Sequence, residues 1–172
     1  SLIIINKPSG IPSVPGLDGR ISAFEILNRA YGNLHIVHRL DMDTSGAIIY
    51  AKTSEAAVDL QRQFEEHTVE KTYLARLSSA PEGMMLKAGE EGEVSLPLSP
   101  DYDERPRQKI DISQGRPSVT SYKVLSVNED GTIDIVFHPQ TGRTHQLRIH
   151  SAHLKGLGHP IVGDMLYGGA EA

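Results

Sequence analysis

The sequence predicts an α+β fold in which strands dominate, most of them pair antiparallel, and a few helices pack beside the sheet. Short apolar and β-branched runs recur along the chain and are stopped by Gly, Pro, Asn or Asp. Two long alternating runs flank Asp130-Gly131, as in an antiparallel hairpin. Helical spacing of apolar residues is confined to a few segments. The 172 residues suit one domain, or one elongated sheet with two lobes.

Strands and helices are expected to alternate in the first half of the chain. Residues 2–5 are continuously apolar, which is typical of a strand buried on both faces. Ser22 and Glu25 have the spacing of a capping box, in which each side chain bonds the backbone N–H of the other at the start of a helix. The expected elements are a strand at residues 2–5, a helix at 22–31, a buried strand at 47–51, and a helix from Thr53 or Ser54 to about Glu66.

The second half is expected to consist mainly of strands. Residues 71–77 alternate between the two faces of a half-buried strand, and residues 79–115 are rich in Gly, Pro and charge, as in an elaborated surface loop. The expected elements are a strand at residues 71–77, a short strand at 94–98, a hairpin of 119–127 with 132–138, and a helix that Thr144 caps and that ends near Gly156.

Composition and charge exclude several classes of protein. The chain has no cysteine, which removes disulfides and thiolate zinc sites, and no apolar run reaches membrane-spanning length. We therefore expect a cytoplasmic protein with no membrane partner, and a monomer is the default. The formal net charge of -5 argues against a generic nucleic-acid binder, although a basic cleft can coexist with an acidic outer surface.

The stretch HRLDMDTSG, residues 38–46, places two carboxylates, an arginine and a histidine between two apolar runs. Strands that hold both ends of a loop let the loop present side chains for chemistry, so Asp41 is the first candidate for a catalytic group. Asp and Ser before Gly are also ordinary turn formers. From this stretch alone, a plain turn and an active site are both open.

A second constellation, TGRTHQ, covers residues 141–146 at the start of the last expected helix. Backbone N–H groups at a helix start favour anions, and Arg143 can form two parallel hydrogen bonds to a carboxylate or a phosphate. If Arg143 pairs with Asp41, the pair would keep Asp41 ionised despite burial. The alternative is a plain helix cap beside a surface arginine.

Histidines and basic residues gather in the same part of the chain. His145, His150 and His153 lack the partners of a recognised metal motif, so we expect structural or RNA-facing histidines and no metal site. Two clusters of basic residues either form solvated faces or bind an anionic partner. These clusters are Arg105, Arg107 and Lys109, and Arg143, Arg148 and Lys155.

Several segments, in this order and at this spacing, resemble the RluA family of pseudouridine synthases. They are KPSG at residues 7–10, HRLDMDTSG at 38–46, KTYLA at 71–75, TGRTHQLRIH at 141–150, and GHPI, GD and YG between residues 158 and 168. The RPRQK segment after Leu96-Pro97-Leu98 is similar to the RluA subgroup itself. The resemblance spans nearly the whole chain, and its two longest strings are too specific for coincidence.

The resemblance implies a mixed, mainly antiparallel sheet with flanking helices and a central catalytic cleft. It implies isomerisation of specific uridines to pseudouridine in structured RNA, either a stem-loop of large-subunit ribosomal RNA, the tRNA anticodon arm, or both. Such an enzyme flips the target base out of its stack. It needs neither a cofactor nor a metal.

The site residues follow from the same resemblance. Asp41 falls on the catalytic aspartate of the family, Arg143 on the arginine that pairs with it, and Tyr73 on a tyrosine that stacks on the target base and is suspected in proton transfer. Arg39 falls on a residue that helps to fill the gap left by the flipped nucleotide. The remaining residues expected to contact RNA are His38, Thr44, Arg105, Arg107, Lys109, His145 and Arg148.

Family members usually continue past the Tyr-Gly pair into a further strand of the sheet. We therefore expect residues 1–172 to form a single pseudouridine synthase catalytic domain that lacks this C-terminal strand segment. We also expect no S4-like RNA-binding domain, which would fit the RluA subgroup.

Two competing functions remain open on the sequence. Asp41 and Asp43 could instead be the nucleophile and acid/base of a magnesium-dependent phosphotransferase, although such a pair normally follows a buried apolar strand. A non-catalytic RNA-binding module could use the same scaffold. That module has no need of an aspartate, a tyrosine and an arginine disposed in this way.

Overall fold

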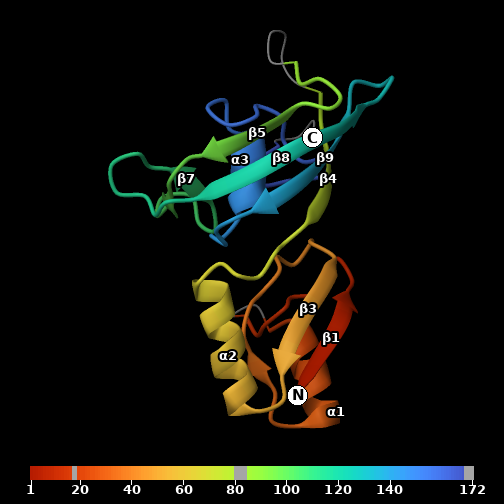
Figure 1. The fold of residues 1–172 in the computed structure, drawn as a ribbon, viewed down its shortest axis with the longest axis vertical. Coiled ribbons are helices and arrows are strands. Elements are labelled where there is room, and N and C mark those ends of the chain that lie inside the picture. Colours follow the sequence, from red (N-terminus) through yellow and green to blue (C-terminus); the bar gives the residue numbers. More distant parts are fainter. Residues whose placement is uncertain (17–18, 80–84, 169–172) are drawn as a thin grey trace. The chain divides into compact units, whose positions relative to one another are not determined.

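A computed structural model describes residues 1–16, 19–79 and 85–168 (Figure 1). The chain divides into two compact units, Ser1–Val69 and Glu70–Ala172. Both units combine antiparallel strands with helices, which confirms the predicted α+β class. That the two units work as one catalytic domain stays a prediction. None of the described helices has the length and apolar character needed to cross a membrane.

The first unit is a three-stranded antiparallel sheet with two helices. Its elements are β1 (Leu2–Lys7), α1 (Ala23–Tyr31), β2 (His35–Ile36), β3 (Gly46–Ala51) and α2 (Ser54–Glu65). The middle strand, β3, pairs with β1 along its whole length and with β2 near its end. Helix α2 packs against β3 and β2 (Figure 1).

Both helices of the first unit begin where the sequence predicts. The Ser22 hydroxyl accepts a hydrogen bond from the N–H of Glu25 at 3.2 Å, and the Glu25 carboxylate accepts one from the N–H of Ser22 at 2.9 Å. This reciprocal pair satisfies two backbone donors at the start of α1. At the start of α2, the Thr53 hydroxyl accepts from the N–H of Ala56. The capping predictions for both helices are therefore confirmed.

The prediction that residues 2–5 form a strand buried on both faces is wrong. Leu2 and Ile4 are 45% and 63% exposed. They share a face of the sheet with their partners on β3, Ala51 and Ile49. Helix α2 covers this face over β3 and β2, and the β1 side chains lie beyond its cover. The strand is correctly predicted, but one of its faces is open among the described residues.

The second unit is built on a four-stranded antiparallel sheet and a separate two-stranded arm. Its elements are β4 (Tyr73–Leu77), β5 (Glu91–Ser95), β6 (Leu98–Pro100), β7 (Gln108–Ile110), β8 (Val119–Val127), β9 (Ile133–Pro139) and α3 (Gln146–Ala152). The strand order of the sheet is β4-β9-β8-β5, and β6 pairs with β7 in the arm. The predicted hairpin of β8 and β9 is confirmed, with Gly131 at the positive φ of 81° that its turn requires.

The core of the second unit lies on one face of the four-stranded sheet. Residues that pair across neighbouring strands, such as Leu77 with Ile133 and Val124 with Ile135, point to this face. Leu147 of α3 packs against it, and Figure 1 shows α3 behind the sheet. The buried members of the core are Leu77, Val94, Val124, Ile133, Ile135, Phe137 and Leu157.

The strand predicted at residues 94–98 is in fact two strands. β5 ends at Ser95 and β6 begins at Leu98, with Pro97 between them. Proline has no backbone N–H to continue a ladder, so the pairing with β8 stops and a new pairing with β7 begins. β7 itself was not predicted, because its three residues carry no apolar alternation.

The last helix is shorter than predicted, and Thr144 does not cap it. α3 starts at Gln146 after His145, which has the left-handed values φ 55° and ψ 20° and gives no side-chain cap. The helix ends at Ala152, with His153 as its C-cap, rather than near Gly156. The left-handed residue sets where the helix can begin, so the Arg143 and Thr144 backbone belongs to the preceding turn.

Candidate active site

Asp41 is the first residue of a tight turn in the connection from β2 to β3. The N–H of Thr44 donates to the carbonyl oxygen of Asp41 at 3.1 Å and closes this turn. The side chain of Asp41 is half-buried. The structure therefore confirms the turn that the sequence left open. A turn with fixed ends is also a suitable support for a reactive carboxylate, so the catalytic hypothesis stands beside it.

Leu40, on one side of Asp41, is held through both of its backbone groups. The Ser13 hydroxyl donates to the Leu40 carbonyl oxygen at 2.7 Å and accepts from the Leu40 N–H at 3.0 Å. The phenol of Tyr50, which is fully buried, donates to the Ser13 carbonyl oxygen at 2.7 Å. Burial raises the pKa of Tyr50 to about 12, so this donor keeps its proton at neutral pH. These contacts connect the loop to the hydrophobic interior of the first unit.

Met42, on the other side of Asp41, is held by a buried lysine. The side chain of Lys7 is fully buried, and its ammonium group has three donors. These donors meet the carbonyl oxygens of Pro8, Ile11 and Met42 at 2.9, 2.8 and 2.9 Å. The Met42 carbonyl also accepts from the N–H of Gly10 at 3.0 Å. Burial lowers the pKa of Lys7, and the nearby Asp43 and Asp41 oppose that shift.

His38, predicted to contact RNA, ties the start of the same loop to its own unit. Its Nε2 accepts a hydrogen bond from the N–H of Ile49 at 2.9 Å. Its ring stacks on Phe64 of α2, with centroids 4.8 Å apart and an interplanar angle of 24°. These contacts give His38 a structural role. Its predicted contact with RNA is not tested by them and stays a prediction.

A small hollow lies beside the Asp41 turn within the first unit. Its volume is about 170 Å³, and its walls are residues 12–16 on one side and Arg39, Leu40 and Met42 on the other. Arg39 is exposed at this hollow, and Thr44 is half-buried in the turn. The structure thus places Arg39, Asp41 and Thr44, all predicted site residues, in one short loop.

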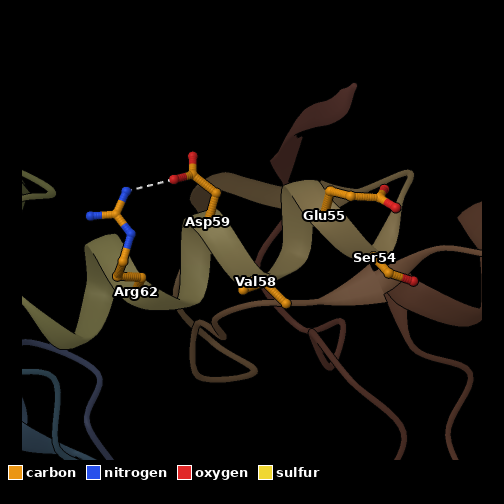
Figure 2. Close-up of a pocket in the computed structure, with 5 residues that line it drawn as sticks. All are labelled: Ser54, Glu55, Val58, Asp59 and Arg62. Atoms are coloured by element: carbon orange, nitrogen blue, oxygen red, sulfur yellow. Dashed lines mark hydrogen bonds and ion pairs between the residues drawn. The ribbon is translucent and has the colours of Figure 1, made fainter.

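A second hollow runs along one face of α2. Figure 2 shows that it is lined by Ser54, Glu55, Val58, Asp59 and Arg62, all from the same helix. It measures about 460 Å³, and its two ends are polar, with Arg62 paired to Asp59 at 2.6 Å. None of the predicted site residues lies in it. A single helix face offers few convergent groups, so this hollow is not a candidate active site.

Tyr73 lies at the start of β4, where it pairs with Phe137 of β9. Its half-buried side chain packs against the core of the second unit. Two residues earlier, the ammonium group of Lys71 lies 3.4 and 3.5 Å from the carbonyl oxygens of Gln140 and Thr141. The start of β4 and the turn that follows β9 therefore lie at the same end of the sheet. Tyr73 and the segment leading to Arg143 are brought to that end.

The turn that carries Arg143 is organised by one buried amide, Gln146, which is 3% exposed. Its Oε1 accepts from the Arg143 N–H at 3.0 Å and from the Thr141 hydroxyl at 2.8 Å. Its Nε2 donates to the Val119 carbonyl oxygen at 3.0 Å and to the Thr120 hydroxyl at 2.9 Å. Gln146 therefore fixes the turn and attaches it to β8.

The Arg143 side chain is half-buried and lies against the segment before β8. Its Nε donates to the Pro117 carbonyl oxygen at 3.2 Å. Burial, and to a lesser degree the charge of Arg116, lowers the pKa of Arg143. Within its own unit, none of the described carboxylates forms an ion pair with Arg143. A second positive charge nearby makes this position favourable for an anion. The predicted pairing of Arg143 with Asp41, which belongs to the other unit, stays a prediction.

The predicted RNA-binding residues of the RPRQK segment lie on the arm made by β6 and β7. Arg105 and Lys109 are exposed, and the Arg105 guanidinium lies over the Tyr102 ring at 5.1 Å. Arg107 is half-buried and pairs with Glu104 at 2.7 Å. The structure brings these three basic side chains together on a short hairpin. Their contact with RNA stays a prediction.

His145 and Arg148, also predicted to contact RNA, meet at one aromatic side chain. The His145 Nδ1 lies 2.9 Å from the Tyr167 hydroxyl, and the Arg148 guanidinium lies over the Tyr167 ring at 5.2 Å. Arg148 also makes a two-armed ion pair with Asp164, at 2.8 and 2.6 Å. Much of its hydrogen-bonding capacity is therefore used within the protein.

His150 has a structural position rather than a ligand position. It is fully buried, with Nδ1 at 3.0 Å from the Thr120 hydroxyl and Nε2 at 3.0 Å from the Leu96 carbonyl oxygen. Burial lowers its pKa, so it is neutral at pH 7. Among the described residues, no group of three histidine or acidic side chains is placed to hold a metal ion.

Sequence reasoning did not identify three residues that hold the candidate site. They are Lys7, Ser13 and Gln146. Lys7 and Gln146 lie within segments that resemble the family, and that position was the only sign in the sequence that they could matter. Ser13 carried no signal, because a serine in a loop rich in Gly and Pro is ordinarily a turn former.

Comparison with known proteins identifies the family to which this chain is similar. A model of the RNA pseudouridylate synthase family matches residues 1–153. Two human proteins of known structure, RNA pseudouridylate synthase domain containing 4 and domain containing 1, are similar to this chain with TM-scores of 0.72 and 0.75 and identities of 28% and 30%. They cover 96% and 98% of this chain, and the chain spans 65% and 66% of theirs, just under two thirds.

Bacterial relatives are closer in sequence. The dual-specificity RNA pseudouridine synthase RluA of Escherichia coli strain K12 is 42% identical over 173 residues, which is 99% of this chain and 75% of the relative. The protein of the same name from Yersinia pestis is 40% identical over 99% of this chain and 80% of its own length. Identity at this level over nearly the whole chain shows the family. The chain therefore belongs to the RluA family of RNA pseudouridine synthases, as its sequence segments predicted.

Proposed function

We propose that this chain converts specific uridines of structured RNA to pseudouridine, that it flips the target base, and that Asp41 is the essential catalytic aspartate. Its bacterial relatives are named dual-specificity RNA pseudouridine synthases. From this resemblance, the proposed substrates are a stem-loop of large-subunit ribosomal RNA, the tRNA anticodon arm, or both. We further propose that the chain acts as a monomer in the cytoplasm, and sedimentation tests the oligomeric state.

The observation that carries the proposal is the way in which the Asp41 turn is held. Ser13 forms hydrogen bonds with the backbone of Leu40 on one side of Asp41, and Lys7 donates to the backbone of Met42 on the other. Each tie comes from a buried side chain, so the backbone on both sides of Asp41 is fixed before any substrate arrives. A reactive group held in advance loses less freedom when it reacts, which lowers the barrier.

The chemistry requires a group such as this carboxylate. Isomerisation breaks the bond between N1 of uracil and C1′ of ribose, turns the base, and joins C5 to C1′. The hydrogen on C5 leaves as a proton and N1 gains one, so the atoms balance without a cofactor. A carboxylate can attack the base, attack the ribose, or remove a sugar proton, and all three routes are open to Asp41.

Tyr73 and Arg143 are proposed to complete the catalytic group from the second unit. An aromatic ring at the end of a strand offers a stacking surface for a flipped base, and Tyr73 has that position. Arg143 has a second arginine for a neighbour, so an anion partner would stabilise it. The Asp41 carboxylate is the partner that we propose. Tyr73→Phe separates stacking from proton transfer, because it removes only the hydroxyl.

The remaining predicted residues are proposed to hold the RNA. Removing a base from its stack costs a few kcal/mol, and contacts to the emptied position and to the phosphates repay this. Arg39 is exposed beside the Asp41 turn and is proposed to fill the emptied position. The phosphate contacts are proposed for His38, Thr44, Arg105, Arg107, Lys109, His145 and Arg148.

The deciding experiment measures release of tritium from RNA labelled at C5 of uracil. A tRNA anticodon arm and a ribosomal stem-loop are offered separately, with a chelator present and with Asp41→Asn in parallel. Release by the wild type alone supports the isomerase, and the responding RNA identifies the substrate class. No tritium release, together with phosphoryl transfer that the chelator abolishes, would favour the magnesium-dependent phosphotransferase. RNA binding without any release would favour a binding module.

A further inference from the structure

Tyr167 forms a junction that the proposed chemistry leaves unused. It is half-buried in the Tyr-Gly segment near the end of the described chain. Its hydroxyl oxygen accepts a hydrogen bond from the N–H of Gln108, the first residue of β7, at 2.7 Å. The same hydroxyl lies 2.9 Å from Nδ1 of His145. One phenol thus joins the arm of β6 and β7 to the turn that follows Arg143.

One of the two hydrogen bonds at this junction has a fixed direction. The backbone N–H of Gln108 can only donate, so the Tyr167 oxygen accepts there. The phenol also forms a hydrogen bond with Nδ1 of His145, and the direction of this second bond follows the tautomer of the imidazole. Tyr167 therefore fixes the orientation of the imidazole, two residues after Arg143 in the chain.

Asp164 holds Tyr167 in this position. Its carboxylate accepts hydrogen bonds from the N–H groups of Leu166 and Tyr167, at 3.0 and 3.1 Å, and from both arms of Arg148. Burial raises the pKa of Asp164, but Arg148 and the two backbone donors outweigh burial and lower it. The support beneath Tyr167 is therefore an ionised, fully bonded carboxylate.

The ring of Tyr167 also lies against two guanidinium groups. Arg148 lies 5.2 Å and Arg107 lies 5.5 Å from the ring centroid. Both distances are within the range of a cation–π contact. Arg107 belongs to the arm and Arg148 belongs to α3. The ring of Tyr167 therefore contacts both the arm and the last helix, as the hydroxyl contacts both the arm and His145.

We propose that Tyr167 is a positioning residue that sets the basic arm, residues 98–110, at a fixed place relative to the Arg143 turn, so that the arm reaches RNA phosphates beside the target base. This inference rests on the proposed function. The arm is a short hairpin with exposed Arg105 and Lys109, and its own pairing holds only three residues per strand. A hairpin that short is not rigid by itself, so its direction depends on its ties to the rest of the unit.

The first test compares Tyr167→Phe with wild type and with Tyr122→Phe. The phenylalanine keeps the ring and its two guanidinium contacts and removes both hydrogen bonds. Tyr122 is a matched control, since it is a half-buried tyrosine of the same unit, on β8, and its hydroxyl interacts with Glu90. We expect Tyr167→Phe to raise the KM and the Kd for RNA about tenfold with a much smaller change in kcat, and Tyr122→Phe to leave them unchanged.

Salt dependence separates positioning from a general loss of stability. Each phosphate contact contributes about 0.7 to 0.9 to the slope of log affinity against log salt. If the arm is no longer held in position, Tyr167→Phe should reduce the steepness of this slope by the contribution of about one to three phosphate contacts. A protein that is merely less stable keeps the wild-type slope below its unfolding temperature.

A double-mutant cycle tests whether Tyr167 acts through the arm. Lys109→Gln removes one proposed phosphate contact and touches neither hydrogen bond of Tyr167. If Tyr167 positions the arm, the effects on Kd of Tyr167→Phe and Lys109→Gln should combine to less than the product of the two fold-changes. Full multiplication of the two effects would contradict the inference.

Hydrogen exchange at the Gln108 amide tests the junction without RNA. Loss of its acceptor should speed this exchange in Tyr167→Phe and leave it unchanged in Tyr122→Phe. Unchanged exchange, or an active wild type with a Tyr167→Phe variant that binds RNA equally well, would overturn the inference and leave the proposed function standing. A folded wild type that neither binds RNA nor releases tritium would overturn both.

Discussion

The two turns that carry the predicted catalytic side chains are held in opposite electrostatic ways. In the first unit, a buried cation, Lys7, bonds the backbone next to Asp41, so positive charge lies close to a carboxylate. In the second unit, a neutral amide, Gln146, bonds the backbone of Arg143, and the charged neighbour is another arginine. One turn has its countercharge inside its own unit. In the other turn, none of the described carboxylates of the same unit forms an ion pair with Arg143.

This difference teaches which turn depends on a partner. A lysine among carbonyl oxygens can balance Asp41 without any ligand, so the first turn is complete within its own unit. Arg143 gains stabilisation when an anion arrives, either the Asp41 carboxylate or an RNA phosphate. Variants that remove Lys7 should therefore affect stability as well as activity, and variants of Arg143 should affect activity alone.

The largest expected effect is that of Asp41→Asn. Replacing the carboxylate with an amide of the same size should lower kcat by at least about 1000-fold, because the amide is a poor nucleophile and a poor base. RNA affinity should stay within about threefold of wild type, since phosphate contacts supply most of it. Asp43→Asn, two residues away in the same turn, is the matched control and should stay active. Tritium release and filter binding measure the two quantities, and normal turnover by Asp41→Asn would remove Asp41 from its role.

The second-largest effect is expected from removing the hydrogen bonds of Lys7. Lys7→Met removes the donor from three carbonyl oxygens in a buried position, so the free energy of unfolding should fall by about 3 kcal/mol and activity should fall with it. Denaturant unfolding monitored by circular dichroism gives the free energy.

Two variants calibrate this measurement. Lys52→Met, at an exposed lysine of the same unit, should change the unfolding free energy by less than about 0.5 kcal/mol. Gln146→Leu, which removes the neutral tie of the other turn, should lower it by about 2 kcal/mol. Equal stability of Lys7→Met and wild type would show that the buried ammonium does not hold the turn.

The third effect concerns the charge of Arg143. Arg143→Ala should lower kcat about 100-fold and leave the melting temperature within about 2 °C of wild type, because no described ion pair of its own unit is lost. Arg116→Ala removes the neighbouring exposed arginine and is the matched control, with little change in kcat. A melting temperature that falls together with activity would mean that Arg143 supports the fold instead.

The smallest effect is a pH dependence in the second unit. His150 shares the Thr120 hydroxyl with Gln146, and burial lowers its pKa below the ordinary value. Above about pH 6.5 the folded and unfolded states are both neutral there, and the stability is fully present. As the pH falls below 6.5, the unfolded chain takes up a proton that the folded chain resists, so stability falls by at most about 1.4 kcal/mol per pH unit.

Unfolding curves from pH 5 to 8 measure this loss. His150→Gln should flatten the pH dependence of the unfolding free energy relative to wild type, because it removes the titrating group. An identical slope in the variant would assign the pH dependence to other histidines.

The sequence by itself determined the family, the fold class and the elements that local patterns encode. The capping box of Ser22 and Glu25 and the turn at Asp130-Gly131 depend on residues within four positions of one another, so spacing alone was sufficient. The strings around Asp41 and Arg143 identified the family for a similar reason, since their residue types and order are visible without coordinates.

Only the tertiary structure decided what holds the site. Ser13 meets Leu40 across 27 positions and Lys7 meets Met42 across 35, and no local pattern marks either pair. Helix α2 does not cover β1, so one face of that strand is exposed. The left-handed conformation of His145 makes α3 begin after Thr144. The physical reason is common to these cases. A buried donor or acceptor must find its partner among whatever segments packing brings together, and that choice belongs to the whole fold.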